Sequence, residues 1–505
     1  MFFFIVSFFL SNVLDIFIII IVVVIFLKES GKNTTLKSIS ASGHSISNEA
    51  LQIFGSALAS QSTSNFTSKN NNKNNDYHGI QSIAIGDEKM GNKGIISLCT
   101  NLKKVNGGLL QNIDFAFKSI SQSGAECIGS VFGSSLNLKK LILYRNTTMG
   151  DDGLIALCDA AAVQSIKSNS ISSSLSSSST GLRPFPVLEC LDLSECNIGI
   201  QGIESLVSCL VGSSSRSSSS SERQNIDEGT HQVTTPTSLL DLKLNSNPIG
   251  SKSCNHLKQL ISCSSSSSYY GHSLLKVLSL NNCSIGDEGM EILANTILNH
   301  SCKHLTSLDL SNNGIGSNGI MILAKALKDG KQNVPNLNEI CLADNSIGEE
   351  GVIALAKSLS SQGVEEENSK GNATLSKLDL TNTNCGIDGA LALMQCTSLS
   401  SLRLFNNNLG STGIEALSTQ LVGGHAYIEH LDIGGNRGNG DSVAKLLKAI
   451  MEDKDQSNFK NALKTLELGG NENNNEDLFA AAREKRPEMD IAQVKETPKD
   501  VPDDS

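Results

Sequence analysis

Tryptophan is absent from this chain of 505 residues, and aromatic residues of all kinds make up only 4% of it. A core of large aromatic anchors is therefore excluded, although 39% of the residues are hydrophobic. This composition is typical of a repeat protein, whose core is built from many equivalent aliphatic positions. The chain is also long enough for several domains.

The sequence also lacks an excess of basic residues. Its formal net charge is -11 at pH 7, and its pI is about 5.4. A general nucleic-acid binder needs a basic face that displaces counterions from phosphates, so nucleic acid is disfavoured as a partner. We predict a protein partner instead, and a basic or neutral protein surface is the easiest to accommodate.

Paired cysteines are missing as well. The thirteen cysteines are an odd number, they lie singly between Cys99 and Cys396, and none forms a CxxC pair. We interpret them as reduced, small apolar residues of the core in a cytosolic-type environment. No catalytic or metal-binding role is predicted for any of them.

Catalytic motifs are equally scarce, and neither HExxH nor GxSxG occurs. The stretch GGNRGNGDS (434–442) approaches the phosphate loop GxxxxGK[ST], but Asp441 stands where the lysine must be and would repel a phosphate. His300, Cys302 and His304 could offer metal ligands, yet they have no second cluster and no carboxylate nearby. The sequence therefore predicts no enzyme, no cofactor and no metal site.

What the chain does contain is a recurring phrase. Residues 305–327 read LTSLDLSNNGIGSNGIMILAKAL, and the frame LxxLxLxx(Asn or Cys)xIGxxG, followed by further apolar residues, recurs along the chain. The repeats that begin at 36, 80 and 110 are degenerate, and the repeat at 375 is short. The thirteen candidate repeats begin at Leu36, Ile80, Leu110, Leu138, Leu188, Leu239, Leu275, Leu305, Leu337, Leu375, Leu399, Ile428 and Leu463.

Each part of the phrase has a physical role. Alternating leucines lie on one face of a short strand, the asparagine can bond the backbone of the adjacent turn, and IGxxG turns the chain into a helix. Acidic residues after the first glycine, as in GDEG at 286 and GEEG at 348, suit a helix N-terminus as side-chain caps for free amides. A single repeat buries too little apolar surface to offset its ordering entropy, so neighbouring repeats must cover its two flat sides.

We therefore predict an α/β solenoid over residues 36–475, a horseshoe of about 13 repeats with a parallel inner sheet and outer helices. The phrase LxLxxNxIG followed by LAKAL (323–327) or LAKSL (355–359) resembles the ribonuclease-inhibitor-like class of leucine-rich repeats. The resemblance implies a non-catalytic scaffold that binds a protein on its concave face. Similar proteins include the repeat domains of NOD-like receptors and the Ran GTPase-activating protein, so a GTPase activator of the Ran type, acting on a small GTPase, is the alternative.

Polar tracts interrupt the repeats after a helix and before the next strand. They lack apolar residues to bury, so we predict disordered insertions at 60–76, 165–180, 213–232 and 264–272. Phosphorylation of their serines is a possible use, although a tolerated insertion is the simpler interpretation. Residues 476–505 are predicted to form a C-terminal cap helix and a mildly acidic tail.

The first 27 residues, MFFFIVSFFLSNVLDIFIIIIVVVIFL, form a hydrophobic run. We predict one hydrophobic helix within residues 1–28, and its length of ~40 Å would allow residues 1–27 to cross a membrane. A cleaved signal peptide and a wrongly assigned chain start are the alternatives.

Lysines fix the orientation of the predicted membrane protein. Lys28, Lys32 and Lys37 follow the hydrophobic run and no Lys or Arg precedes it, which favours a single-pass protein with its repeats facing the cytosol. A soluble cytoplasmic or a secreted protein is the alternative. Six glycosylation sequons would be usable if the repeats were lumenal, at Asn33, Asn65, Asn146, Asn282, Asn299 and Asn372.

Charged side chains occupy the middle variable position of several predicted strands. They form an acidic stripe, interrupted by Lys243 and Arg403, that could attract a basic partner surface. Tyr144, Arg145 and Phe405 occupy another outward position, and such side chains usually anchor affinity. A solvated consensus is the plainer alternative, because LDL is a common spelling of this repeat. The acidic residues of the stripe are Asp114, Asp192, Asp309, Asp379, Asp432 and Glu467.

Overall fold

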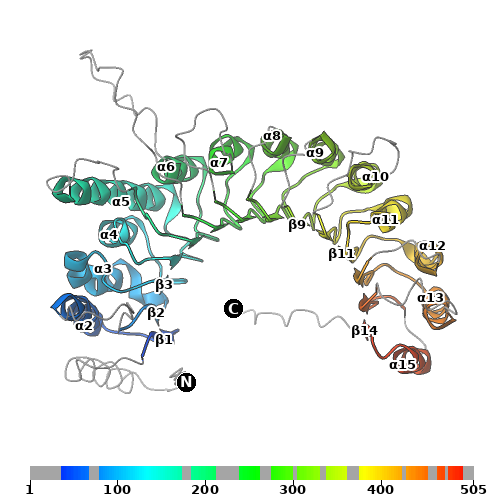
Figure 1. Ribbon diagram of the computed structural model, residues 1–505, viewed down its shortest axis with the longest axis horizontal. Coiled ribbons are helices and arrows are strands. Elements are labelled where there is room, and N and C mark those ends of the chain that lie inside the picture. The colour runs from blue at the N-terminus through cyan, green and yellow to red at the C-terminus, as the bar shows by residue number, and fades with distance from the viewer. Residues whose placement is uncertain are drawn as a thin grey trace, which may run out of the picture. The chain divides into compact units, whose positions relative to one another are not determined.

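The computed structural model describes most of the chain in eleven segments. These are residues 36–67, 79–172, 183–211, 238–261, 274–298, 304–329, 337–360, 375–422, 428–452, 463–472 and 476–492. The chain divides into two compact parts, which we call the N-terminal half (Met1–Leu278) and the C-terminal half (Ser279–Ser505). Each half alternates short strands with helices, and each is described by itself (Figure 1).

The N-terminal half holds the first six strands and the helices that follow them. Its strands are β1 (Ser38–Ser42), β2 (Ser82–Gly86), β3 (Asn112–Asp114), β4 (Lys140–Ile142), β5 (Cys190–Asp192) and β6 (Asp241–Lys243). Its α-helices are α2 (Asn48–Thr67), α3 (Gly91–Leu102), α4 (Gln122–Phe132), α5 (Gly150–Ser172), α6 (Ile200–Val211) and α7 (Cys254–Ile261). Short 3-10 helices occur at Glu88–Met90, Lys103–Val105 and Ser251–Ser253, and strand β7 (Val277–Ser279) lies at the boundary between the halves.

The C-terminal half repeats the same alternation. Its strands are β8 (Ser307–Asp309), β9 (Glu339–Cys341), β10 (Lys377–Asp379), β11 (Ser401–Arg403), β12 (His430–Asp432), β13 (Thr465–Glu467) and β14 (Asp490–Ala492). Its helices are α8 (Gly286–Leu298), α9 (Ser317–Asp329), α10 (Gly348–Leu359), α11 (Gly386–Met394), α12 (Gly410–Val422), α13 (Gly440–Glu452) and α15 (Glu476–Lys485).

The strands of each half pair in parallel and in chain order. In the N-terminal half β1 to β6 pair successively, and in the C-terminal half β8 to β14 do the same. The register aligns one aliphatic residue of each strand with the next, as in Leu141 opposite Leu191 and Leu402 opposite Leu431. Each of these four leucines is at most 2% exposed, so the aligned row forms the core between sheet and helices.

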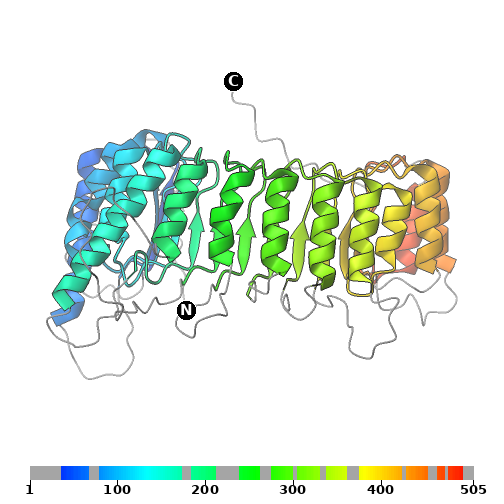
Figure 2. The ribbon, with the colours of Figure 1, turned by 90° about the horizontal axis from the view of Figure 1, so that it is seen from above.

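Helices cover one face of the sheet in each half, and each helix packs against its neighbours in the row (Figures 1 and 2). The opposite face of the sheet, which we call the strand face, carries the side chains that flank the buried row. Within each half the strands lie on the inner side of a curve, because helices need more lateral space than strands. The predicted solenoid with a parallel sheet and outer helices is therefore confirmed. The predicted helix within residues 1–28 lies outside the described residues.

Asparagines at one position of the repeat join each repeat to the one before it. The Asn345 Oδ1 accepts hydrogen bonds from the backbone amides of Asn313 and Ile315, each at 3.0 Å, and its Nδ2 donates to Leu310 O and Leu342 O, each at 2.9 Å. We predicted bonds within the adjacent turn, and the structure adds bonds to the preceding repeat. The sequon residue Asn146 has the same role and is 0% exposed, so the folded chain withholds it from glycosylation.

Acidic residues in the first helical turn cap the helix of the following repeat. Asp151 Oδ1 accepts from the Gly199 amide at 2.6 Å, and Asp287 Oδ1 accepts from the Gly316 amide at 2.7 Å. Glu349 likewise accepts from an amide at the start of α11. The predicted side-chain caps therefore join neighbouring repeats, because stacking places the helix N-terminus of the following repeat beside each acidic residue.

Two boundaries differ from the sequence-based prediction. Helices α2 and α5 continue to Thr67 and Ser172, so residues 60–67 and 165–172 are helical where insertions were predicted. A tertiary contact accounts for the longer α5, since Ser165 is 2% exposed and its Oγ donates to Gly133 O of the preceding repeat at 3.5 Å. The remaining residues of the four polar tracts lie almost wholly outside the described segments. Strand β14 was not predicted.

The prediction of a single-pass membrane protein is corrected. Among the described residues, no helix combines the length and the apolar surface needed to cross a bilayer. The longest one, α5, has 23 residues but is interrupted by aspartates and serines. The hydrophobic run 1–27 lies outside the described residues.

Candidate protein-binding surface

The strand face carries the residues predicted to contact a partner. In the N-terminal half, the register places Asp114, Ile142, Asp192 and Lys243 side by side across β3 to β6. In the C-terminal half, Asp309 and Asp379 flank Cys341, and Arg403, Asp432 and Glu467 continue the row across β11 to β13. The predicted stripe therefore exists as a row within each half, and apolar and basic residues interrupt it.

The aspartates of this row close the turn that follows each strand. Asp114 Oδ1 accepts from the Ala116 amide at 2.9 Å, Asp192 Oδ1 accepts from the Ser194 amide at 3.0 Å, and the same bond recurs at Asp309, Asp379 and Asp432. One carboxylate oxygen of each residue thus has a structural role. This bond accounts for the recurrence of LDL without any partner.

The aspartates of the row differ in how far their second carboxylate oxygen is available to a partner. Asp379 Oδ2 lies 3.5 Å from Arg403 Nη1, in an exposed ion pair. The Asp432 side chain is only 3% exposed, so it presents almost no surface. The row consequently presents less negative charge to a partner than its sequence indicates.

Phe405 lies against the backbone of the next repeat. A Cβ on Gly434 would lie 2.9 Å from Phe405 Cδ2, and a Cβ on Gly435 would lie 3.0 Å from Phe405 Cζ. The two glycines therefore make the room that the ring occupies. The ring is half-buried.

A left-handed residue follows the strand in every repeat from β3 to β13. Its φ is positive, a conformation that favours Gly, Asn and Asp and is unfavourable for larger side chains. In most repeats the residue fits this preference or, at Ser246, is small: Ser246, Asn282, Asn312, Asp344, Asn382, Asn406, Gly435 and Gly470. Three consecutive repeats break it, with Phe117 at φ 58°, Arg145 at φ 60° and Glu195 at φ 54°.

These three residues and Tyr144 contact one another, and we call them the aromatic-arginine cluster. The Arg145 guanidinium lies 5.1 Å from the centre of the Phe117 ring, in the range of a cation–π interaction. Arg145 Nε is 3.4 Å from Glu195 Oε2, and the Tyr144 hydroxyl donates to Glu195 Oε1 at 2.8 Å. This last bond, together with burial and the negative charge of Glu195, raises the pKa of Tyr144.

The cluster is open to solvent. The Phe117 residue is 45% exposed, and the side chains of Arg145 and Glu195 are 51% and 35% exposed. Sequence analysis found Tyr144 and Arg145 but missed Phe117 and Glu195. The missed signal is the position three residues after the end of each strand, where Phe and Glu depart from the Asn, Asp, Ser and Gly of most other repeats.

Comparison with known proteins agrees with this architecture. A family profile described as Leucine Rich repeat matches residues 134–158, 186–207, 271–294, 301–324, 335–356 and 395–418, all of which overlap repeats predicted from the sequence. Ribonuclease inhibitor of Mus musculus is 25% identical over 249 residues, which are 49% of this chain and 43% of that protein. The profile matches and this similarity support a leucine-rich-repeat protein similar to the ribonuclease-inhibitor-like class.

Solved structures are also similar to the leucine-rich-repeat chain, at low sequence identity. A chain of the Rad7 and Elc1 complex of yeast has a TM-score of 0.42 at 13% identity, covering 91% of this chain and 84% of that chain. An internalin of Listeria monocytogenes has a TM-score of 0.36 at 13% identity, covering 80% of this chain and 88% of that chain. Leucine-rich-repeat proteins of this class are typically binding proteins without catalytic activity.

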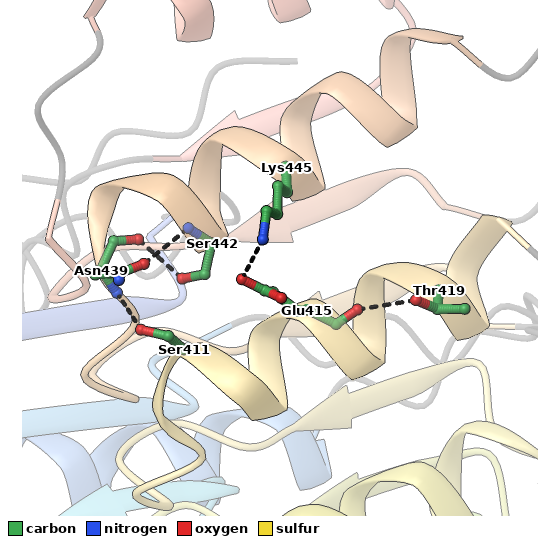
Figure 3. A network of polar contacts seen from close by, with 6 residues as sticks. All are labelled: Ser411, Glu415, Thr419, Asn439, Ser442 and Lys445. Atoms are coloured by element: carbon green, nitrogen blue, oxygen red, sulfur yellow. Dashed lines mark hydrogen bonds and ion pairs between the residues drawn. The ribbon is translucent and has the colours of Figure 1, made fainter.

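The near phosphate loop of the leucine-rich-repeat chain is a helix cap. Asn439 Oδ1 accepts from the Ser442 amide at 2.8 Å at the start of α13, and Ser442 Oγ donates to Asn439 O at 2.8 Å (Figure 3). Ser442 is 0% exposed, so its hydroxyl is not available to a ligand. The Asn439 amide donates to Ser411 Oγ at 3.0 Å, which joins α13 to α12.

The candidate metal ligands lie mostly beyond the described residues. His300 and Cys302 fall outside them, and His304 alone is described. In the described part of the chain, no three His, Cys, Asp or Glu residues gather closely enough to hold a metal ion. The described cysteines are free thiols, and burial raises the pKa of both Cys196 and Cys385 to about 12.

Proposed function

We propose that this leucine-rich-repeat protein is a non-catalytic interaction scaffold that holds a protein partner at its strand face, with the aromatic-arginine cluster as the anchor. The observation that carries the proposal is the left-handed backbone of Phe117, Arg145 and Glu195 in three consecutive repeats. Other repeats accept Asn, Asp, Ser or Gly there, so the fold itself does not require these side chains.

Backbone strain opposes the side chains of Phe117, Arg145 and Glu195. A left-handed conformation costs an L-residue roughly 1–2 kcal/mol, and strain of this kind gathers at binding sites. Backbone hydrogen bonds between repeats hold the conformation, as from the Arg145 amide to Ser194 O at 2.9 Å. Exposed aromatic and arginine side chains are the residues that most often dominate binding energy. Partner binding therefore explains why these three positions carry side chains that lower local stability.

The other predicted contact residues fit around this anchor. Asp114 on β3 and Asp192 on β5 lie on either side of β4 and can steer a basic surface by long-range attraction. In the C-terminal half, Asp309, Asp379, Arg403, Phe405, Asp432 and Glu467 stay predictions for a second contact. The alternative of a GTPase activator is not part of the proposal, because no residue here can be assigned an activating role.

The test uses random peptides displayed on phage and selected against the full chain. Replacing Phe117→Asn or Tyr144→Ser, residues that other repeats carry at these positions, should weaken the best selected peptide by at least about tenfold. Ile96→Asn on helix α3, where the residue is 41% exposed, is the matched control and should leave affinity unchanged. Binding that survives both cluster substitutions would refute the proposed surface.

A further inference from the structure

We infer that the partner presents a carboxylate side chain to the open edge of the Arg145 guanidinium, next to an apolar residue that contacts Phe117 and Tyr144. The inference rests on the proposed function and deepens it by naming the chemistry of the contact. It follows from an account of the donors and acceptors within the aromatic-arginine cluster.

The acceptors of the cluster are already occupied. Glu195 Oε1 accepts from the Tyr144 hydroxyl at 2.8 Å, and Glu195 Oε2 lies 3.4 Å from Arg145 Nε. Asp192 Oδ1, on the neighbouring strand, accepts from the Ser194 amide. A basic ligand at this cluster would thus compete with the contacts of Glu195, and it would also meet the positive charge of Arg145.

The donors of the cluster are largely unused. A guanidinium carries five N–H donors, and Arg145 forms its ion pair with Glu195 through Nε at 3.4 Å. Within the described part of the chain, the four N–H groups on Nη1 and Nη2 have no acceptor at hydrogen-bond distance. A ligand that completes the site must supply acceptors, and a carboxylate matches the two parallel donors of this edge.

The guanidinium is held in place before any ligand arrives. Phe117 lies against one face at 5.1 Å, and Glu195 fixes the Nε edge. Ordering a long side chain normally weakens association, so a preformed arginine retains more of its interaction energy for the partner. With 51% of the Arg145 side chain exposed, the open edge is accessible.

A carboxylate is favoured over a phosphate group by the surrounding charges. Asp114, Asp192 and Glu195 all lie on the strand face or the adjoining turns of β3 to β5. A phosphate carries nearly two negative charges and three acceptor oxygens, so these carboxylates repel it more strongly than a singly charged group. The half-buried Tyr144 and the exposed Phe117 ring provide the apolar surface for the neighbouring residue.

The experiment is a double-mutant cycle on a selected peptide. Peptides selected against the full chain should be enriched in Asp or Glu beside an apolar residue. The acidic residue of the best peptide is changed to its amide, and Arg145→Gln and Arg145→Lys are made in the protein. We expect each change alone to weaken binding and the pair to be coupled by at least about tenfold. Arg145→Lys should recover only part of the loss, because a lysine lacks the planar fork.

The outcomes separate the inference from the proposed function. If the peptides carry no acidic residue, or if the two changes act independently, the carboxylate inference is overturned. Continued loss of binding with Tyr144→Ser would then still support the strand face. If Tyr144→Ser and Phe117→Asn also leave binding unchanged, the proposed surface fails and the inference fails with it. Thermal unfolding of each variant, at a midpoint no lower than that of the unchanged chain, excludes misfolding as the cause.

Discussion

At the scale of single residues, the ladder asparagines show what a sequence can and cannot reveal. Their recurrence predicts a side chain bonded to backbone, and this is confirmed at Asn247, Asn345 and Asn436. The bonds to the preceding repeat could not be predicted, because the sequence of one repeat contains no information on where its neighbour lies. Lys118 occupies this position in its repeat and is 2% exposed, which explains why the repeat at 110 fits the template poorly.

Replacing Asn345→Ala should lower the free energy of unfolding by about 2–4 kcal/mol, because it leaves buried amides and carbonyls of two repeats without partners. Urea unfolding followed by circular dichroism measures the change. Asn318→Ala is the matched control, since Asn318 is exposed in the first turn of α9. Equal stability of the two variants would contradict the role of the ladder.

The cysteines titrate according to their burial. Burial raises the pKa of Cys196 and Cys385 to about 12 from an ordinary value of 9.0. A hydrogen bond from the Cys99 thiol lowers the pKa of the half-buried Cys127. Because the pKa of each buried thiol is raised in the folded state, the thiols contribute stability to the fold below pH 9. This contribution is lost as the pH rises from 9 toward 12.

We therefore expect a fixed order of alkylation by iodoacetamide in the native protein at mildly alkaline pH. Cys127 should react first, and Cys196 and Cys385 should react at rates near those of global unfolding. Mass spectrometry of the digested protein assigns each site. Rapid labelling of Cys196 in the native state, comparable to labelling in urea, would contradict the assigned burial.

At the scale of elements, glycines set how closely neighbouring helices approach. A Cβ on Gly129 of α4 would lie 2.2 Å from Leu157 O of α5, and a Cβ on Gly55 of α2 would lie 1.9 Å from Leu98 O of α3. Both glycines are in the degenerate N-terminal repeats, where the template does not identify them. Only the packed helices show that these positions exclude a side chain.

Gly129→Ala should destabilise the N-terminal half by more than about 2 kcal/mol, because backbone of two helices must separate to admit the methyl group. Ser123→Ala, at an exposed position of the same helix, should be neutral or slightly stabilising. Hydrogen exchange measured across α4 and α5 should increase in the first variant alone. Unchanged protection in Gly129→Ala would argue against the close helix contact.

At the scale of the whole molecule, the repeat pattern predicted the architecture because each repeat depends on its neighbours for burial. Strands begin two residues after each predicted repeat start, from Leu36 and Ser38 to Leu463 and Thr465. The short strand β14 could not be predicted, since it has one central Ile491 and is held by Arg483, which donates to Ile491 O at 2.7 Å. The proposed binding surface was predicted only in part, because backbone conformation distinguishes Phe117 and Glu195 from most of their equivalents.

The central claim is that three side chains at strained positions are kept for binding. It is tested most directly by the full chain carrying Phe117→Asn, Arg145→Asn and Glu195→Asn together. The account predicts that the urea midpoint rises, with a gain in unfolding free energy of at least about 1 kcal/mol, while affinity for the selected peptide falls at least about tenfold. A lower midpoint with unchanged peptide affinity would contradict it.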